Sequence, residues 1–146
     1  MKQIILTEKN FNKLKLEIKK NKDKEIIFTS EDDEFNRKVL EKLPIQILLI
    51  SLENKKDYAK QRNSGFNQVM AKIAKKNKIK IGIPLDEIIN SKNKERILAR
   101  LKQNIMLCNK NKVQMIFIQE KNKKDIQSLK SLMLILGMHT SSVKNL

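Results

Sequence analysis

The chain has 146 residues, of which 40% are hydrophobic and 33% charged, a size and composition that suit one globular domain over residues 1–146 with a single core. Its formal net charge is +16 at pH 7. Self-repulsion at that charge opposes the compact state, so we expect a polyanionic partner, most commonly nucleic acid. The longest apolar runs, Ile47–Ile50 and Leu132–Leu136, are too short to cross a bilayer, and we expect neither a membrane span nor a secretory signal.

Short apolar segments alternate with amphipathic ones along the whole chain, which is typical of a parallel α/β architecture. Five strands are predicted, at Gln3–Leu6, Glu25–Thr29, Ile45–Ile50, Ile79–Ile83 and Val113–Ile118. Five helices are predicted between and after them, at Glu8–Asn21, Glu31–Leu43, Ser64–Asn77, Lys92–Asn109 and Lys123–Leu136. A sixth strand could come from the C-terminal tail.

An acidic run opens the second predicted helix. Ser30 is expected to cap that helix, and the four carboxylates of residues 31–34 fill its first turn, where the positive end of the helix dipole favours them. We therefore interpret the run as structural rather than as a metal site. Pro44 is expected to stop the helix before the third strand.

The segment from Leu52 to Asn63 is the most polar connection and contains no clear strand. Loops of this kind often carry function. Its cations Lys55, Lys56, Lys60 and Arg62 fit either a functional loop or a solvated basic segment.

Three later segments carry distinctive residue patterns. The first lies between Ser64 and Ile83, and its pattern consists of Gly65, Asn67, Gln68, Val69, Met70, Ala71, Lys72, Asn77, Ile79, Ile81, Gly82 and Ile83. In the second the positions are Arg96, Arg100, Asn104, Leu107, Cys108, Lys112 and Val113. In the third they are Ser131, Leu132, Gly137, Met138 and Lys144. In this order the segments resemble the protein component 3 family of archaeal and eukaryotic ribonuclease P, and the resemblance covers residues 57–146, whereas the first 56 residues match only in pattern.

The resemblance implies a strand-helix barrel of the TIM type, which needs eight strands and about 200 residues or more. This chain offers five or six mostly parallel strands, so the expected fold is an abbreviated or open TIM-like (β/α) barrel. Lys80 is expected in the middle of the fourth strand, where an unpaired charge inside a closed barrel would be costly. In an opened barrel its face could meet water or RNA.

Few residues are suited to catalysis by the polypeptide. His139 is the only histidine, which argues against a histidine-rich metal centre, and we expect it at the surface or at a helix start. Three glycines, Gly65, Gly82 and Gly137, lie too far apart for a phosphate-cradling loop. Cys108, the single cysteine, excludes an intrachain disulfide, fits a reducing cytoplasm and is expected to be a buried structural thiol. No metal or other cofactor is expected on the chain itself.

The cations are unevenly distributed. Residues 1–62 hold 15 basic and 11 acidic side chains, whereas residues 63–146 hold 17 and 5. Lys, Asn and Ile make up 63 of the 146 residues, a bias that AT-rich coding sequence also produces, but such a bias would load lysine evenly. Aromatic residues amount to 4%, so we expect phosphate contacts rather than base stacking. The candidate RNA-binding residues are Arg62, Lys72, Lys80, Arg96, Arg100 and Lys144.

Among these, Arg96 and Arg100 are four residues apart and are predicted to project from one helical face, as a fork for phosphate. The alternative is a solvated face with Glu95 as a local partner.

The resemblance implies a cytoplasmic protein subunit of ribonuclease P that supports the catalytic RNA in removing the 5′ leader of precursor tRNA. Its partners would be the ribonuclease P RNA, protein component 2 and, through the holoenzyme, precursor tRNA, with Mg²⁺ in the RNA active site. The alternatives are a generic basic RNA-binding or ribosome-associated α/β module and a metal-dependent phosphoesterase.

Overall fold

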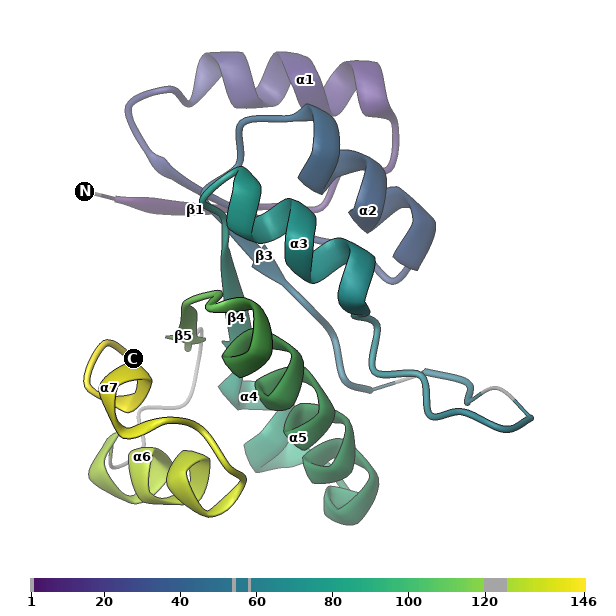
Figure 1. The fold of residues 1–146 in the computed structure, drawn as a ribbon. Helices are drawn as coiled ribbons and strands as arrows, with labels where there is room; N and C mark the ends of the chain where they lie inside the picture. The colour runs from purple at the N-terminus through teal and green to yellow at the C-terminus, as the bar shows by residue number, and fades with distance from the viewer. Residues whose placement is uncertain (1, 54, 58, 120–125) are drawn as a thin grey trace.

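The computed structural model describes residues 2–53, 55–57, 59–119 and 126–146 (Figure 1). Its strands are β1 (Gln3–Leu6), β2 (Glu25–Thr29), β3 (Ile47–Leu49), β4 (Lys80–Pro84) and β5 (Met115–Ile118). Its helices are α1 (Phe11–Lys20), α2 (Asp33–Lys42), α3 (Gln68–Lys76), α4 (Leu85–Asn90), α5 (Lys94–Asn111), α6 (Ile126–Ile135) and α7 (Thr140–Val143).

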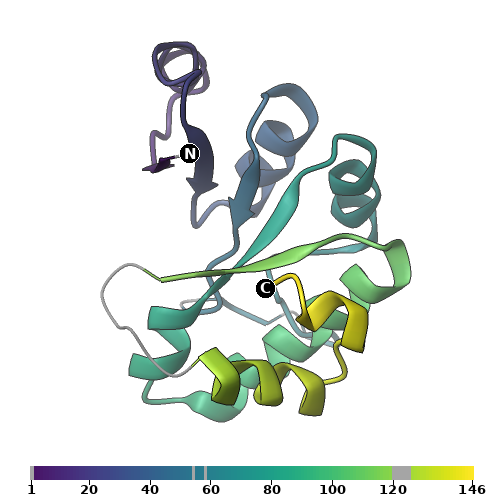
Figure 2. The same ribbon diagram turned by 90° about the vertical axis from the view of Figure 1, so that its left-hand side faces the viewer.

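The five strands form one parallel sheet in the order β1-β2-β3-β4-β5, the order of the chain itself. Crossovers between parallel strands are right-handed, so a sheet that grows in one direction places every connecting helix on the same face. Figures 1 and 2 show the helices gathered in this way beside the twisted sheet. Within the described residues the sheet is open, because β1 and β5 each pair with one neighbour.

The two faces of the sheet carry separate apolar clusters. The larger cluster joins inward side chains of the strands, such as Phe28, Leu48 and Ile81, to buried residues from all seven helices. The smaller cluster contains Ile27, Ile47, Leu49 and Ile118, with Ile5 and Ile116 packed against them, and every member comes from a strand. Alternation along each strand separates the two sets. The second face is thus covered by no helix in the described part of the chain, and its side chains bury one another.

Most strand predictions are confirmed. β1 and β2 have the predicted bounds, while β3 is shorter than predicted at both ends. At its start, the side-chain Oε1 of Gln46 accepts the hydrogen bond from the Ile26 amide, at 2.7 Å. The α/β prediction with parallel strands is correct. The possible sixth strand is not, since the described part of the tail forms α6 and α7. The beginning of the predicted 123–136 helix lies outside the described residues.

Helix starts differ from the predictions for local reasons. Asp32, not Ser30, caps α2, because its Oδ1 accepts from the amides of Glu34 and Phe35. Asp33 and Glu34 do fill the first turn, as expected. α3 begins after the Asn67 cap rather than at Ser64, and Gly65 has a φ of +76°, which no helix start adopts.

Other expectations about single residues are met. Cys108 is a buried free thiol, and burial raises its pKa to about 12, so it is protonated and unreactive near neutral pH. His139 is exposed and occupies the N-cap position of α7.

Among the helices that the structure describes, none has the length and apolar character needed to cross a membrane.

Gly82 allows the smaller apolar cluster to close. A Cβ at this position would lie 3.0 Å from Ile118, 3.1 Å from Leu49 and 3.2 Å from a methyl of Ile47. Gly82→Val is therefore expected to overpack the face and lower the free energy of unfolding by about 1–3 kcal/mol. Urea denaturation measures the change.

Lys80→Val is the matched control, since it places the same side chain on the same face of the same strand, two residues earlier, where a side chain already stands. Its expected effect is within about 0.5 kcal/mol. If Gly82→Val lowers the free energy of unfolding no more than Lys80→Val does, the face has room for a side chain at position 82.

Candidate nucleic-acid interface

The described residues of the β3–α3 connection, 50–53, 55–57 and 59–67, run along one side of α5. The backbone carbonyls of Leu52 and Lys55 accept hydrogen bonds from the Arg100 side chain. Further along, the Ser64 carbonyl accepts one from the Asn104 side chain. At the end of the run, the amides of Gln68 and Asn111 pair reciprocally at 2.9 and 3.0 Å. Residues 100, 104 and 111 share one helical face because their spacings are four and seven. A polar stripe on α5 thus fixes the path of an otherwise irregular segment.

Arg100 is the centre of this stripe. Only 2% of the residue is exposed, and its guanidinium donates to the Leu52 carbonyl at 2.8 Å, to the Lys55 carbonyl at 2.6 Å and to Asp57 Oδ1 at 3.3 Å. The expectation that Arg96 and Arg100 share a solvent-facing surface is therefore wrong: Arg96 is exposed and Arg100 is interior. A planar fork with several donors suits carbonyl oxygens as well as phosphate.

Two further side chains hold the connection at its start. Glu87 of α4 accepts from the Ser51 hydroxyl at 2.6 Å and from the Leu52 amide at 2.8 Å. Lys55, whose side chain is 4% exposed, forms a salt bridge with Asp33 of α2. Lys55 is thus a structural cation and Glu87 an anchor, so neither is free for chemistry in this arrangement.

Exposed cations remain around this scaffold. Lys56, Lys60 and Arg62 are exposed on the connection, and the Arg62 carbonyl accepts from Gln103 of α5 at 3.5 Å. At the start of α5, exposed Lys92 and Arg96 line a pocket of about 470 Å³. The other residues lining the pocket are Glu53, Lys55, Asn90, Ser91, Asn93, Ile97 and Arg100. This arrangement can bind phosphate groups through ammonium and guanidinium donors.

The remaining candidate residues lie on separate elements. Lys72 is exposed on α3, Lys144 is exposed after α7, and Lys80 is the first residue of β4, half-buried on the helix-free face of the sheet. The structure therefore places Arg62 next to Gln103 of α5 and Arg96 in the pocket at the start of that helix, and it does not gather all six residues into one patch. Lys92 was not among the sequence-based candidates. Its place just before a long helix was the signal that could have identified it.

The carboxyl ends of the strands are acidic instead. Two pockets there, of about 380 and 680 Å³, share Thr29, Ser51 and Glu87. Glu31, Asp32, Glu53 and Asp86 also line one or the other, and Lys9 lines the larger one. Within the described residues, no group of three or more acidic, histidine or cysteine side chains could hold a metal ion. Glu120 and Asp125, which could have joined Glu87 at this rim, lie outside the described residues. Carboxylates repel phosphate, so the candidate interface lies beside this edge and not over it.

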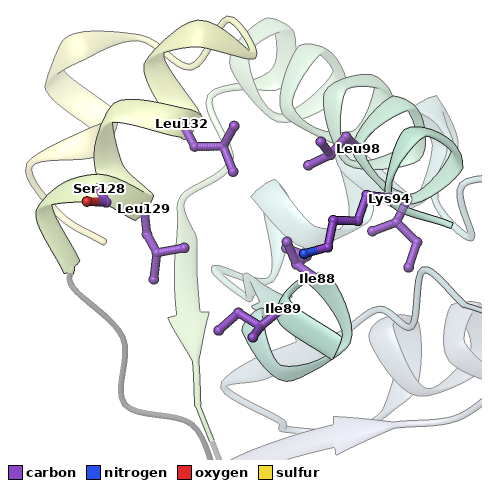
Figure 3. A pocket seen from close by; sticks show the side chains of 8 residues that line it. Ile88, Ile89, Lys94, Leu98, Ser128, Leu129 and Leu132 are labelled. Carbon is purple, nitrogen blue, oxygen red and sulfur yellow. The ribbon is translucent and has the colours of Figure 1, made fainter. Parts of the chain in front are cut away.

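A third kind of surface is apolar. A groove of about 360 Å³ lies between α4, α5 and α6. Figure 3 shows Leu129 and Leu132 of α6 facing Leu98 of α5 and Ile88 and Ile89 of α4, with the Lys94 side chain extending along the groove. Apart from Lys94 and Ser128 the lining is aliphatic, so this groove differs in chemistry from the candidate interface.

Replacing Arg100 with Met is expected to release the connection. The change keeps side-chain length but leaves the Leu52 and Lys55 carbonyls without their donors, at about 1–3 kcal/mol for each buried group. Trypsin cleavage after Lys56, Lys60 or Arg62 should become faster under native conditions.

Arg96→Met is the matched control, one turn earlier on the same helix but exposed. It should leave the cleavage rate unchanged. If trypsin cleaves the two variants equally fast, Arg100 does not hold the connection.

Asp57 is expected to make this anchoring pH-dependent. The hydrogen bond from the Asn63 amide, at 2.8 Å, lowers the pKa of Asp57 below its usual 3.8, and the Arg100 guanidinium and the charge of Arg96 act in the same direction. A lowered folded-state pKa contributes stability that is present above pH 3.8 and is lost as the pH falls through the folded value. The wild type should therefore exceed Asp57→Asn in stability near neutral pH, with the difference vanishing in acid.

An NMR titration of the Asp57 carboxyl carbon tests the cause directly. The midpoint should lie below 3.8 in the wild type and rise in Arg100→Met. A wild-type midpoint at or above 3.8 would contradict the account.

Comparison with known proteins finds a likeness in structure only. No protein-family model matches the sequence, and no curated protein matches it. The structure is similar to a chain in the "cryo-EM structure of archaeal Ribonuclease P with mature tRNA", with a TM-score of 0.78 and 18% sequence identity. The match covers 93% of this chain but only 60% of that chain. At this identity the comparison shows a shared fold.

Proposed function

We propose that this chain is a protein subunit of ribonuclease P of the component 3 type. The observation that carries the proposal is the match over 93% of the chain to a chain in an archaeal ribonuclease P structure. The three segments that resemble component 3 in sequence support it independently, because that resemblance does not depend on the fold. Two of them include Arg100, Asn104 and Gln68, which build the path of the β3–α3 connection.

The proposed fold is a part of a TIM-like strand-helix barrel. Strands in chain order, all parallel and with their helices on one face, are the arrangement of such a barrel over five of its eight units. The helix-free face would correspond to the barrel interior. A chain that covers 60% of its structural neighbour fits the same interpretation.

The proposed mechanism assigns the chemistry to RNA. The RNA active site with its Mg²⁺ ions cleaves the 5′ leader of precursor tRNA, and this protein supplies positive charge. Bringing two polyanions together is opposed by repulsion, and cations held on a fixed scaffold reduce that repulsion. The exposed cations Lys56, Lys60, Arg62, Lys92 and Arg96 are the proposed contacts beside α5.

The proposed protein partner is component 2. Surfaces that bind proteins are apolar at their centre, and α6 exposes Leu134 and Ile135, the latter 80% exposed, while its other side lines the groove of Figure 3. Association there would shield side chains that otherwise face water. The subunit would then gain stability from its partner.

Precursor-tRNA cleavage by the cognate ribonuclease P RNA with component 2 tests the proposal, with and without this chain, across a Mg²⁺ titration at fixed salt. The chain should lower the Mg²⁺ concentration needed for half-maximal cleavage while leaving the cleavage position unchanged. A triple Lys56→Gln, Lys60→Gln, Arg62→Gln variant should lose a large part of this effect.

An unrelated basic protein of equal net charge is the control, and it should not substitute. If it lowers the Mg²⁺ requirement equally, or if the chain binds the cognate RNA no better than an unrelated structured RNA, the proposal fails. A generic RNA-binding module would then account for the charge.

A further inference from the structure

A second group of cations surrounds a pocket at the opposite edge of the sheet. Five lysines line this pocket of about 480 Å³: Lys15, Lys19, Lys22, Lys24 and Lys42. They come from α1, from the turn that follows it and from the last turn of α2. None of them was among the candidates named from the sequence.

The pocket has a built floor. Ile18, Ile26 and Leu43 are buried beneath it, and Pro44 and Gln46 complete the lining. Gln46 is held in place because its Oε1 accepts from the Ile26 amide. The position of the pocket is therefore fixed by the same core that holds β2 against α1 and α2.

The lysines are not compensated by acids. No acidic side chain lines the pocket, and within the described residues none of the five lysines forms a salt bridge. Helix dipoles account for cations in the last turns, where Lys19 and Lys42 lie, but not for the other three. Lys15 and Lys19 are one helical turn apart and repel each other. An anion in the pocket would relieve this repulsion.

The chemistry selects a phosphodiester chain over a small anion. A single phosphate is best held by arginine forks or backbone amides. This pocket is lined by no arginine, and its cations are all flexible lysine side chains. The nearby end of α1 presents carbonyl groups, two of which are already occupied, that of Glu17 by the Asn21 side chain and that of Ile18 by its amide. Long mobile ammonium groups around an apolar floor suit several successive phosphates.

We propose that this lysine pocket binds the backbone of a second RNA segment, so that the protein bridges two parts of one folded RNA. The proposal rests on the proposed function in taking RNA as the ligand. The pocket lies at the amino ends of the strands, whereas the interface beside the β3–α3 connection lies toward their carboxyl ends. β2 alone, with five residues, spans about 16 Å between these edges. That exceeds the screening length of about 8 Å at physiological salt, so the two sites act independently.

The test compares two triple variants of the full chain. Lys15→Gln, Lys19→Gln, Lys22→Gln removes three exposed cations from the pocket, and Lys75→Gln, Lys102→Gln, Lys110→Gln removes three exposed cations that do not line it. Affinity for the cognate ribonuclease P RNA is measured across salt concentrations. The pocket variant should reduce the slope of log affinity against log salt by about two, and the control by less than about one. Thermal melts followed by circular dichroism should be unchanged in both variants, which confirms that they fold. A variant with Lys15, Lys19 and Lys22 all replaced by Arg should restore the wild-type slope.

Hydroxyl-radical footprinting identifies the second segment. The pocket variant should lose protection at one RNA segment, and Arg96→Gln at a different one. Equal slopes for the two glutamine triples, or loss of protection at the same RNA segment from variants at both sites, would overturn the proposal.

An NMR titration with inorganic phosphate should show no saturation. If chemical shifts confined to the pocket saturate and RNA does not reverse them, the pocket is a small-anion site and the proposal is wrong.

Failure of the proposed function is distinguishable from failure of this inference. If the chain binds an unrelated structured RNA equally well, the subunit assignment fails, yet a larger slope change for the pocket variant on that RNA would still support the pocket. If the triples behave alike on both RNAs, the pocket is overturned whatever the cleavage assay shows.

Discussion

The buried guanidinium of Arg100 is the interaction on which the candidate interface depends. Placing a cation 98% out of solvent is costly unless its donors find acceptors. Here two backbone carbonyls and Asp57 accept from the two terminal nitrogens, while Nε has no hydrogen-bond partner among the described residues. Those acceptors belong to an irregular segment that Glu87, Asp33 and Asn104 also hold. The charge and the segment therefore stabilise each other: the segment solvates the arginine, and the arginine fixes the positions of the Leu52 and Lys55 carbonyls.

That arrangement separates scaffold from contact among residues of the same type. Arg100 and Lys55 face protein groups, whereas Arg96, Arg62 and the neighbouring lysines face solvent. The acidic pockets at the strand ends lie next to this basic surface. A polyanion approaching the molecule is repelled from the sheet edge and attracted beside α5, so charge of both signs defines where a polyanion can bind.

The elements of the sheet were predictable because each strand has its own apolar run and is bounded by a turn or a helix. β1 and β2 show this, with bounds that match the prediction. α4 was not predicted: it has six residues, follows Pro84 directly and is too short to show a helical period. The role of Arg100 was also beyond the sequence, since helical spacing placed it with Arg96. What separates the two is the β3–α3 connection, whose path along α5 depends on long-range contacts that no local pattern encodes.

In the proposed RNA interface, Arg100 acts through the β3–α3 connection and does not itself touch phosphate. The first measurement is RNA affinity in a double-mutant cycle of Arg100→Met and Arg62→Gln. Each change should weaken binding, and the double variant should lose less than the sum, because a released connection no longer presents Arg62. The cycle of Arg100→Met with Lys144→Gln, on a different element, should be additive. Additivity in both cycles, or no effect of Arg100→Met on binding, would rule out this role of Arg100.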